Sequence, residues 1–128
     1  MKKMKNYSSN TLGTHLVCDF WGAEKTKLED TTYLRNLLIE ASNNANAIVI
    51  DVAMHKFKPE GITIVALLAE SHVSIHTWPE EDYAAIDVFT CGDRMNPYAF
   101  LEALERELSP KTSNIEKISR GNLDDKPK

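Results

Sequence analysis

The sequence has few cysteines for the disulfides of a secreted domain and no long apolar segment to anchor a protein in a membrane. It holds two cysteines, Cys18 and Cys91, which cannot form a disulfide framework and favour a reducing compartment. No stretch approaches the roughly 20 apolar residues of a membrane span. The N-terminal MKKMKNYSSN is basic, but no apolar segment follows it, so we expect no signal peptide. The sequence therefore predicts a cytoplasmic protein without a membrane segment.

An excess of basic residues and a glycine-rich phosphate loop are also missing. The chain carries 15 Lys and Arg against 19 Asp and Glu, for a formal net charge of −4, and the two signs are mixed. Nucleic-acid binding is disfavoured, since such proteins usually show a basic face. None of the five glycines forms a phosphate-binding loop, and the chain is short for a pyridoxal phosphate enzyme, so that cofactor is not expected.

The 128 residues suit one domain with one hydrophobic core. At this length about two-thirds of the unfolded surface can be buried, so no metal or disulfide is needed for stability. We expect a flexible N-terminal arm over 1–12, a single domain over 13–120 and a polar tail over 121–128.

Hydrophobic patterning predicts six strands and two helices. One helix face repeats through Leu34, Leu37, Leu38, Ala41 and Ala45, and a second helix begins at Asn96-Pro97, a favourable cap followed by a first-turn proline. The strands are expected over 14–21, 47–57, 62–69, 72–78, 83–91 and 114–119.

The resulting order, β-α-β-β-β-β-α-β, favours an α+β two-layer sandwich. Strands that follow one another without helical crossovers pair mainly antiparallel, and both helices can cover one face of the sheet. Segments 62–69 and 83–90 are apolar over much of both faces, and a bare apolar sheet face is a sticky patch. We therefore expect a dimer that stacks sheet on sheet.

The stretch ESHVSIHTWPE (70–80) gathers reactive side chains that a core strand does not need. His72 and His76 have the spacing of helical metal ligands, but HVSIHTW is β-branched and aromatic, which predicts a strand. Residues four apart on a strand lie about 13 Å apart and cannot bind one ion together. No metal site is predicted.

Two other interpretations of this stretch stay open from the residues alone. Ser71 or Cys91 could be the nucleophile of a small hydrolase, with His76 as its base and Asp87 orienting a histidine. No G-x-S-x-G elbow surrounds Ser71, which argues against this class. The plainer alternative is a half-exposed strand with satisfied histidines and a small buried cysteine, in a binding module without catalysis.

A specific resemblance to a known family favours a different enzyme reaction over both the hydrolase and the binding module. ESHVSIHTWPE, followed by YAAIDVFTCGD (83–93), resembles the processing and active-site segment of the prokaryotic S-adenosylmethionine decarboxylase proenzymes. GTHLVCDF (13–20) and HKFKPEGITIVALLAES (55–71) resemble other strands of that family, so the likeness spans roughly residues 13–120.

The resemblance implies that the chain cleaves itself between Glu70 and Ser71. The Ser71 hydroxyl would attack the Glu70 carbonyl, and elimination would then turn residue 71 into a pyruvoyl group, the cofactor of this family. His76 matches the base of this processing, and an ordinary histidine pKa near 6.5 suits that role. Thr63 matches a hydroxyl that assists the acyl shift. The family commonly has Ser there, and the extra methyl is expected to slow processing.

The resemblance also implies the catalytic and binding roles. The amine of S-adenosylmethionine would form a Schiff base with the pyruvoyl ketone, and Cys91 matches the proton donor after decarboxylation, as a thiol can be at pH 7. Phe57 matches an aromatic that stacks on adenine, and Glu80 matches the acid that binds the ribose hydroxyls. The product would feed spermidine synthesis. Trp78 is equally well a structural residue, and His15 and Asp19 receive no role.

Alternative substrates within this chemistry are arginine and ornithine, because a fold does not fix its substrate.

One geometric requirement follows from the proposed pair of Ser71 and His76. On a regular strand, residues five apart project to opposite faces. His76 can serve Ser71 only if the chain turns or bulges near 70–72, and a regular ladder through 68–76 would count against this mechanism.

Overall fold

Six strands form one continuous sheet in the computed structural model, which describes residues 11–128. Their spatial order is β2-β3-β4-β5-β1-β6, and every pairing is antiparallel. The strands are β1 (Gly13–Trp21), β2 (Val49–Lys56), β3 (Ile62–Leu68), β4 (Ser71–Trp78), β5 (Tyr83–Cys91) and β6 (Thr112–Arg120). The expected arm over 1–12 lies almost wholly outside the described residues.

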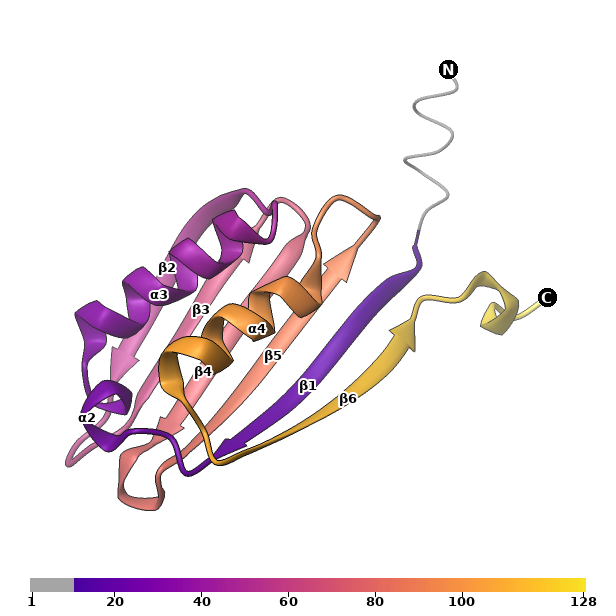
Figure 1. Cartoon of the computed structure of the whole chain (residues 1–128). Helices are drawn as coiled ribbons and strands as arrows, with labels where there is room; N and C mark the ends of the chain where they lie inside the picture. The colour runs from indigo at the N-terminus through magenta and orange to yellow at the C-terminus, as the bar shows by residue number, and fades with distance from the viewer. Residues whose placement is uncertain (1–10) are drawn as a thin grey trace.

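The two long helices lie on the same face of the sheet, as Figure 1 shows. In α3 (Thr31–Asn44) the Asp30 side chain caps the first turn by accepting from Tyr33 N at 3.0 Å. In α4 (Pro97–Leu108) Asn96 accepts from two backbone N–H groups of the first turn. Both helices, their order and the α+β two-layer architecture are confirmed. The short helix α2 (Lys25–Leu28) was not predicted, since four residues carry no periodicity.

The core lies between the helices and the sheet face that they cover. Alternate residues of the central strands point into it, such as Leu16, Cys18 and Phe20 of β1 and Val73 and Ile75 of β4. They meet the predicted apolar stripes of the helices, which are buried: Leu34, Leu37, Leu38, Ala41, Phe100, Leu101, Leu104 and Leu108. Strands β2 and β6 form the edges and are largely exposed.

The opposite sheet face, which we call the open face, is more polar than the sequence suggested. It carries Asp87 from β5 at its centre, hydrogen-bonded to His15 of β1 and approached by Ser74 of β4. On this face β5 contributes Ala85 and Phe89 beside Asp87, so Asp87 is the charged exception in a segment expected to be apolar over much of both faces. Val65 and Leu67 of β3 keep part of the open face apolar.

Within residues 11–128, no helix combines the length and the apolar character needed to cross a bilayer. Beyond the sheet, the expected polar tail holds one short 3-10 turn, η2 (Leu123–Asp125), with every residue exposed.

A buried hydroxyl ties helix α2 to the β3–β4 hairpin. Thr77 Oγ1 accepts from Ile62 N at 3.0 Å and donates to the Leu28 carbonyl at 2.9 Å. Thr77 is almost fully buried, so neither backbone group has water as a substitute partner.

We expect Thr77→Val to lower the free energy of unfolding by about 1–3 kcal/mol, because the shape is kept while two buried backbone groups lose their partner. Urea unfolding followed by circular dichroism measures this loss. Thr112→Val on the exposed edge strand β6 is the matched control and should change stability little. Equal stability of the two variants would contradict this account of the hairpin.

Candidate active site

The turn between β3 and β4 presents the expected cleavage point at one end of the sheet. Leu68 pairs with Ser71, which leaves only Ala69 and Glu70 in the turn. Ala69 N donates to the Ile48 carbonyl at 2.9 Å, and Cys91 N donates to the Glu70 carbonyl at 3.0 Å. The carbonyl that Ser71 would attack is thus held by a backbone donor from the end of β5.

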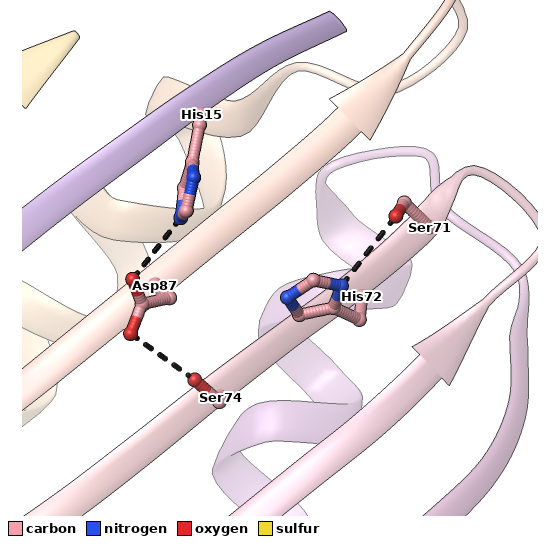
Figure 2. A network of polar contacts seen from close by, with 5 residues as sticks. All are labelled: His15, Ser71, His72, Ser74 and Asp87. Atoms are coloured by element: carbon pink, nitrogen blue, oxygen red, sulfur yellow. Dashed lines mark hydrogen bonds and ion pairs between the residues drawn. The ribbon is translucent and has the colours of Figure 1, made fainter. Parts of the chain in front are cut away.

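Ser71 has an unusual backbone conformation at this turn. Its φ is 152°, a value that side chains with a Cβ rarely adopt. Its Oγ lies 3.5 Å from Nδ1 of His72, whose ring is near Phe89 on the open face (Figure 2). The structure therefore places His72 beside Ser71, a neighbour to which the sequence assigned no role.

The two cysteines lie in different environments. Cys91 is half-buried at the end of β5, next to the turn, and lines a cavity of about 270 Å³ with Glu70 and Arg94. Cys18 is buried under the helices, where burial first and the Asp19 charge second raise the pKa of its thiol to about 12. Only Cys91 is placed to reach a ligand at the turn.

The remaining predicted site residues gather at the other end of β4. Thr63 Oγ1 and His76 Nδ1 lie 3.0 Å apart on neighbouring strands. They share a cavity of about 340 Å³ whose lining residues are Phe57, Glu60, Gly61, Thr63, His76, Thr77, Trp78 and Glu80. Phe57 and Glu80, the two binding residues that the resemblance implied, thus line one cavity together with the implied processing pair.

Glu60 is the residue of this cavity that the sequence did not single out. Its Oε1 is buried and has no hydrogen-bond partner among the described residues. The only sequence signal was its position in the KPEG loop directly after Phe57. Trp78 also lines the cavity, with 42% of its surface exposed, so it is placed to contact a ligand.

The structure does not bring His76 to Ser71 within one chain. Beyond the two-residue turn, the β3–β4 ladder runs without a register shift from Leu68↔Ser71 to Thr63↔His76, and this regularity counts against a pairing of Ser71 with His76 of the same chain. The bulge that would swing His76 toward Ser71 is absent. Five strand residues separate the two by about 16 Å.

A polar network lies between these two ends of the open face. His15 Nε2 lies 3.1 Å from Asp87 Oδ1, and Ser74 Oγ lies 3.4 Å from Asp87 Oδ2 (Figure 2). Asp87 therefore orients His15 and neither His72 nor His76. The Ser71-His76-Asp87 arrangement of the hydrolase alternative is not formed.

A second contact in this region joins Tyr83 to Asp19. The Tyr83 hydroxyl donates to Asp19 Oδ1 at 2.6 Å. Burial, followed by this hydrogen bond, raises the pKa of Tyr83 to about 12, so its hydroxyl stays protonated at neutral pH. Tyr83 also stacks on Trp21 and packs against Trp78, which extends the aromatic lining toward the larger cavity.

Across residues 11–128 no three His, Cys, Asp or Glu side chains are grouped closely enough to hold a metal ion. His72 and His76 point to one face of β4, separated by the intervening Ser74.

Comparisons with known proteins match nearly the whole chain. A family model described as S-adenosylmethionine decarboxylase matches residues 14–121. An S-adenosylmethionine decarboxylase proenzyme of Methanococcus maripaludis is 44% identical over 114 residues, covering 89% of this chain and 93% of the relative. One from Clostridium tetani is 39% identical over 112 residues, covering 88% of this chain and 89% of the relative.

The fold is shared as well. The crystal structure of the adenosylmethionine decarboxylase from Aquifex aeolicus superimposes with a TM-score of 0.83 at 37% identity, covering 93% of this chain and 98% of the other. The family model, these relatives and the shared fold show that the chain belongs to the S-adenosylmethionine decarboxylase family.

Proposed function

We propose that the chain is a proenzyme that cleaves itself between Glu70 and Ser71 and then decarboxylates S-adenosylmethionine. The observation that carries the proposal is the 3.0 Å hydrogen bond from Cys91 N to the Glu70 carbonyl, beside a strained Ser71. It brings Cys91, from the end of β5, next to the turn that contains the scissile carbonyl and the attacking hydroxyl. The product would supply aminopropyl groups for spermidine synthesis.

Self-cleavage begins with the Ser71 hydroxyl and the Glu70 carbonyl. As Ser71 Oγ adds to this carbonyl, negative charge develops on its oxygen, which already accepts from Cys91 N. A donor fixed in advance at a developing oxyanion lowers the barrier. Strain at Ser71 raises the energy of the intact peptide relative to the rearranged one, which favours the same step.

The turn fits a pyruvoyl group at residue 71, since the neighbouring groups serve the reaction that makes it. Once formed, that group supplies a ketone that accepts the electrons released when the substrate loses carbon dioxide. The Cys91 side chain, half-buried beside the turn, then returns a proton to the substrate carbon. A reduced thiol is needed for this, which supports a cytoplasmic location.

The base for processing is supplied by a second copy of the chain. Ser71 and His76 lie at opposite ends of β4. Ser71 Oγ lies 3.5 Å from Nδ1 of His72, which lies on the uncovered face of the sheet together with His76. Two sheets that stack face to face with β4 strands reversed bring the turn of one copy over the Thr63–His76 pair of the other. We propose this sheet-on-sheet dimer, with each site completed by the partner's Thr63, His76, Phe57 and Glu80.

The substrate fits the larger cavity by its chemistry. Phe57, with 48% of its surface exposed, offers a flat face for adenine, and the Glu80 carboxylate can accept from two ribose hydroxyls. Neither arginine nor ornithine has a base or a sugar for these residues, so the nucleoside is favoured.

The purified protein should separate into two chains. Intact mass spectrometry is expected to show fragments 1–70 and 71–128, whose summed mass equals the full chain plus water minus ammonia. Borohydride with S-adenosylmethionine should add a substrate adduct to the 71–128 fragment alone. Arginine and ornithine, tested in parallel, should leave that fragment unmodified. One uncleaved chain without an adduct after long incubation would overturn the proposed function.

Co-expression of two inactive variants tests the shared site. Ser71→Ala removes the nucleophile, and His76→Ala removes the base, so each alone should stay uncleaved. In mixed dimers, the His76→Ala chain should be cut, because the Ser71→Ala partner supplies its His76. His72→Ala, which changes the histidine beside Ser71, is the matched control and should still be cleaved. Failure of the mixed dimers, together with loss of cleavage in His72→Ala, would place the base in the same chain.

Cys91→Ala separates processing from decarboxylation. Its backbone N–H remains, so cleavage into two chains should continue, whereas decarboxylation should fall by about 10²–10⁴-fold, the usual contribution of a positioned acid. Release of labelled carbon dioxide measures the rate. Cys18→Ala, in the core under the helices, should keep the rate per folded molecule and lower only the melting temperature. Equal decarboxylation rates in both variants would remove Cys91 from the reaction.

A further inference from the structure

The cleavage turn has an unusual balance of charge. The smaller cavity is lined by Ala69, Glu70, Cys91, Gly92, Asp93 and Arg94. Two of these six are acidic, and Arg94 is their one cation. Glu70, Asp93 and Arg94 therefore line one small volume beside the bond proposed to be cut.

The Glu70 side chain is nearly buried and is held by protein contacts rather than by water. It is 8% exposed, and its Oε1 accepts from Ile48 N at 3.1 Å. Its Oε2 lies 3.5 Å from Arg94 Nη1, an ion-pair distance, and has no hydrogen-bond donor among the described residues. A nearly buried carboxylate needs a charged partner, and Arg94 is the one that this carboxylate has.

Cleavage places a further negative charge on the same residue. The acyl shift first replaces the 70–71 peptide bond by an ester between the Glu70 carbonyl carbon and Ser71 Oγ, which frees the amine of residue 71. A base then removes the Cα proton of residue 71, and the bond between Cβ and the ester oxygen breaks. Both electrons of that bond leave with the new α-carboxylate of Glu70, and dehydroalanine remains at residue 71. Water then replaces the amine as ammonia.

We propose that Arg94 is the positioning residue for this leaving group: its guanidinium stabilises the new Glu70 carboxylate during elimination and holds it in the mature enzyme. The inference rests on the proposed function, since it concerns the same cleavage. Arginine suits the task because five N–H donors in a planar fork can serve both carboxylates of Glu70 at once. Without Arg94, three negative charges would share the cavity.

The exposure of the Arg94 side chain sets how much its removal should slow cleavage. The Arg94 side chain is 56% exposed, so water screens part of its charge. Loss of the charge should therefore slow elimination by about three- to tenfold rather than abolish it. The preceding acyl shift forms no carboxylate and should be little affected, so the ester should accumulate.

The experiment follows cleavage of full-length Arg94→Gln over time by intact mass, with and without hydroxylamine. Hydroxylamine attacks esters, and an accumulated ester would yield a Glu70 hydroxamate on 1–70 and a free N-terminal Ser71 on 71–128. We expect slower cleavage and this hydroxylamine-dependent pair of fragments in Arg94→Gln. Arg94→Lys keeps the charge without the planar fork, so it should slow cleavage less than Arg94→Gln does.

Neighbouring substitutions give matched controls of charge. Asp93→Asn removes a competing anion and should cleave at least as fast as the wild type. Arg106→Gln, in the last turn of α4, makes the same change of net charge elsewhere and should not slow cleavage. The Arg94→Gln defect should shrink when Glu70→Gln is added, because one of the two carboxylates is then neutral.

Cleavage of folded Arg94→Gln at the wild-type rate, with no hydroxylamine-dependent fragments, would overturn the role of Arg94 and leave the proposed function intact. Slowing by Arg106→Gln to the same degree would also overturn it, since net charge alone would then explain the effect. A wild-type chain that never cleaves is a different result, because it removes the proposed function itself.

Discussion

The chemistry at Ser71 depends on how the two-residue turn between β3 and β4 is held. Three backbone or side-chain contacts fix it: Ala69 N to the Ile48 carbonyl, Ile48 N to the Glu70 carboxylate, and Cys91 N to the Glu70 carbonyl. They come from the segment before β2 and from the end of β5, so the position of the scissile carbonyl is set by distant parts of the chain. A local turn with only sequence-adjacent contacts would be free to relax away from this geometry.

The regularity of β4 divides the site into two parts. An unbroken antiparallel ladder holds residues 71–76 extended, which keeps the nucleophile and the proposed base at opposite ends of the strand. The same regularity fixes the distance between Ser71 and His76. A second sheet stacked with its β4 reversed can therefore place its His76 over Ser71 of the first copy. The polar His15–Asp87–Ser74 network lies midway between those ends on the open face. Within a stacked dimer it would be buried at the centre, where satisfied polar groups favour one register over others.

Much of the fold could be predicted from the sequence, because its signals are local. The helix faces, the Asn96 cap and the alternation within β4 and β5 follow from periodicity and from the preferences of single residues. The polar network on the open face could not be predicted in this way, since the spatial partners of Asp87 come from two other strands.

The candidate site was predictable in its members and not in its arrangement. The resemblance named six residues. The structure places Thr63, His76, Phe57 and Glu80 on one cavity and Cys91 on another, with Ser71 at the turn beside the second. No spacing rule shows that the His72 ring, rather than the His76 ring, lies beside Ser71 Oγ, or that Arg94 pairs with Glu70. Both contacts depend on how the turn is packed. Charge relationships across a turn appear only when the strands are placed.

A self-cleaving protein needs strain at the bond that is cut and rigid contacts around it that keep the fold together. Ser71 and its surroundings provide both. An unfavourable φ costs about 1–3 kcal/mol and persists only where surrounding contacts determine it. The proposed cleavage at 70–71 would release this strain, since residue 71 would become a chain end. The sheet does not open as a result, because β4 stays paired with β3 on one side and with β5 on the other. The Glu70 side chain keeps the new end of the first chain in place, so the cut would remove a covalent bond at a point where non-covalent contacts already hold both ends.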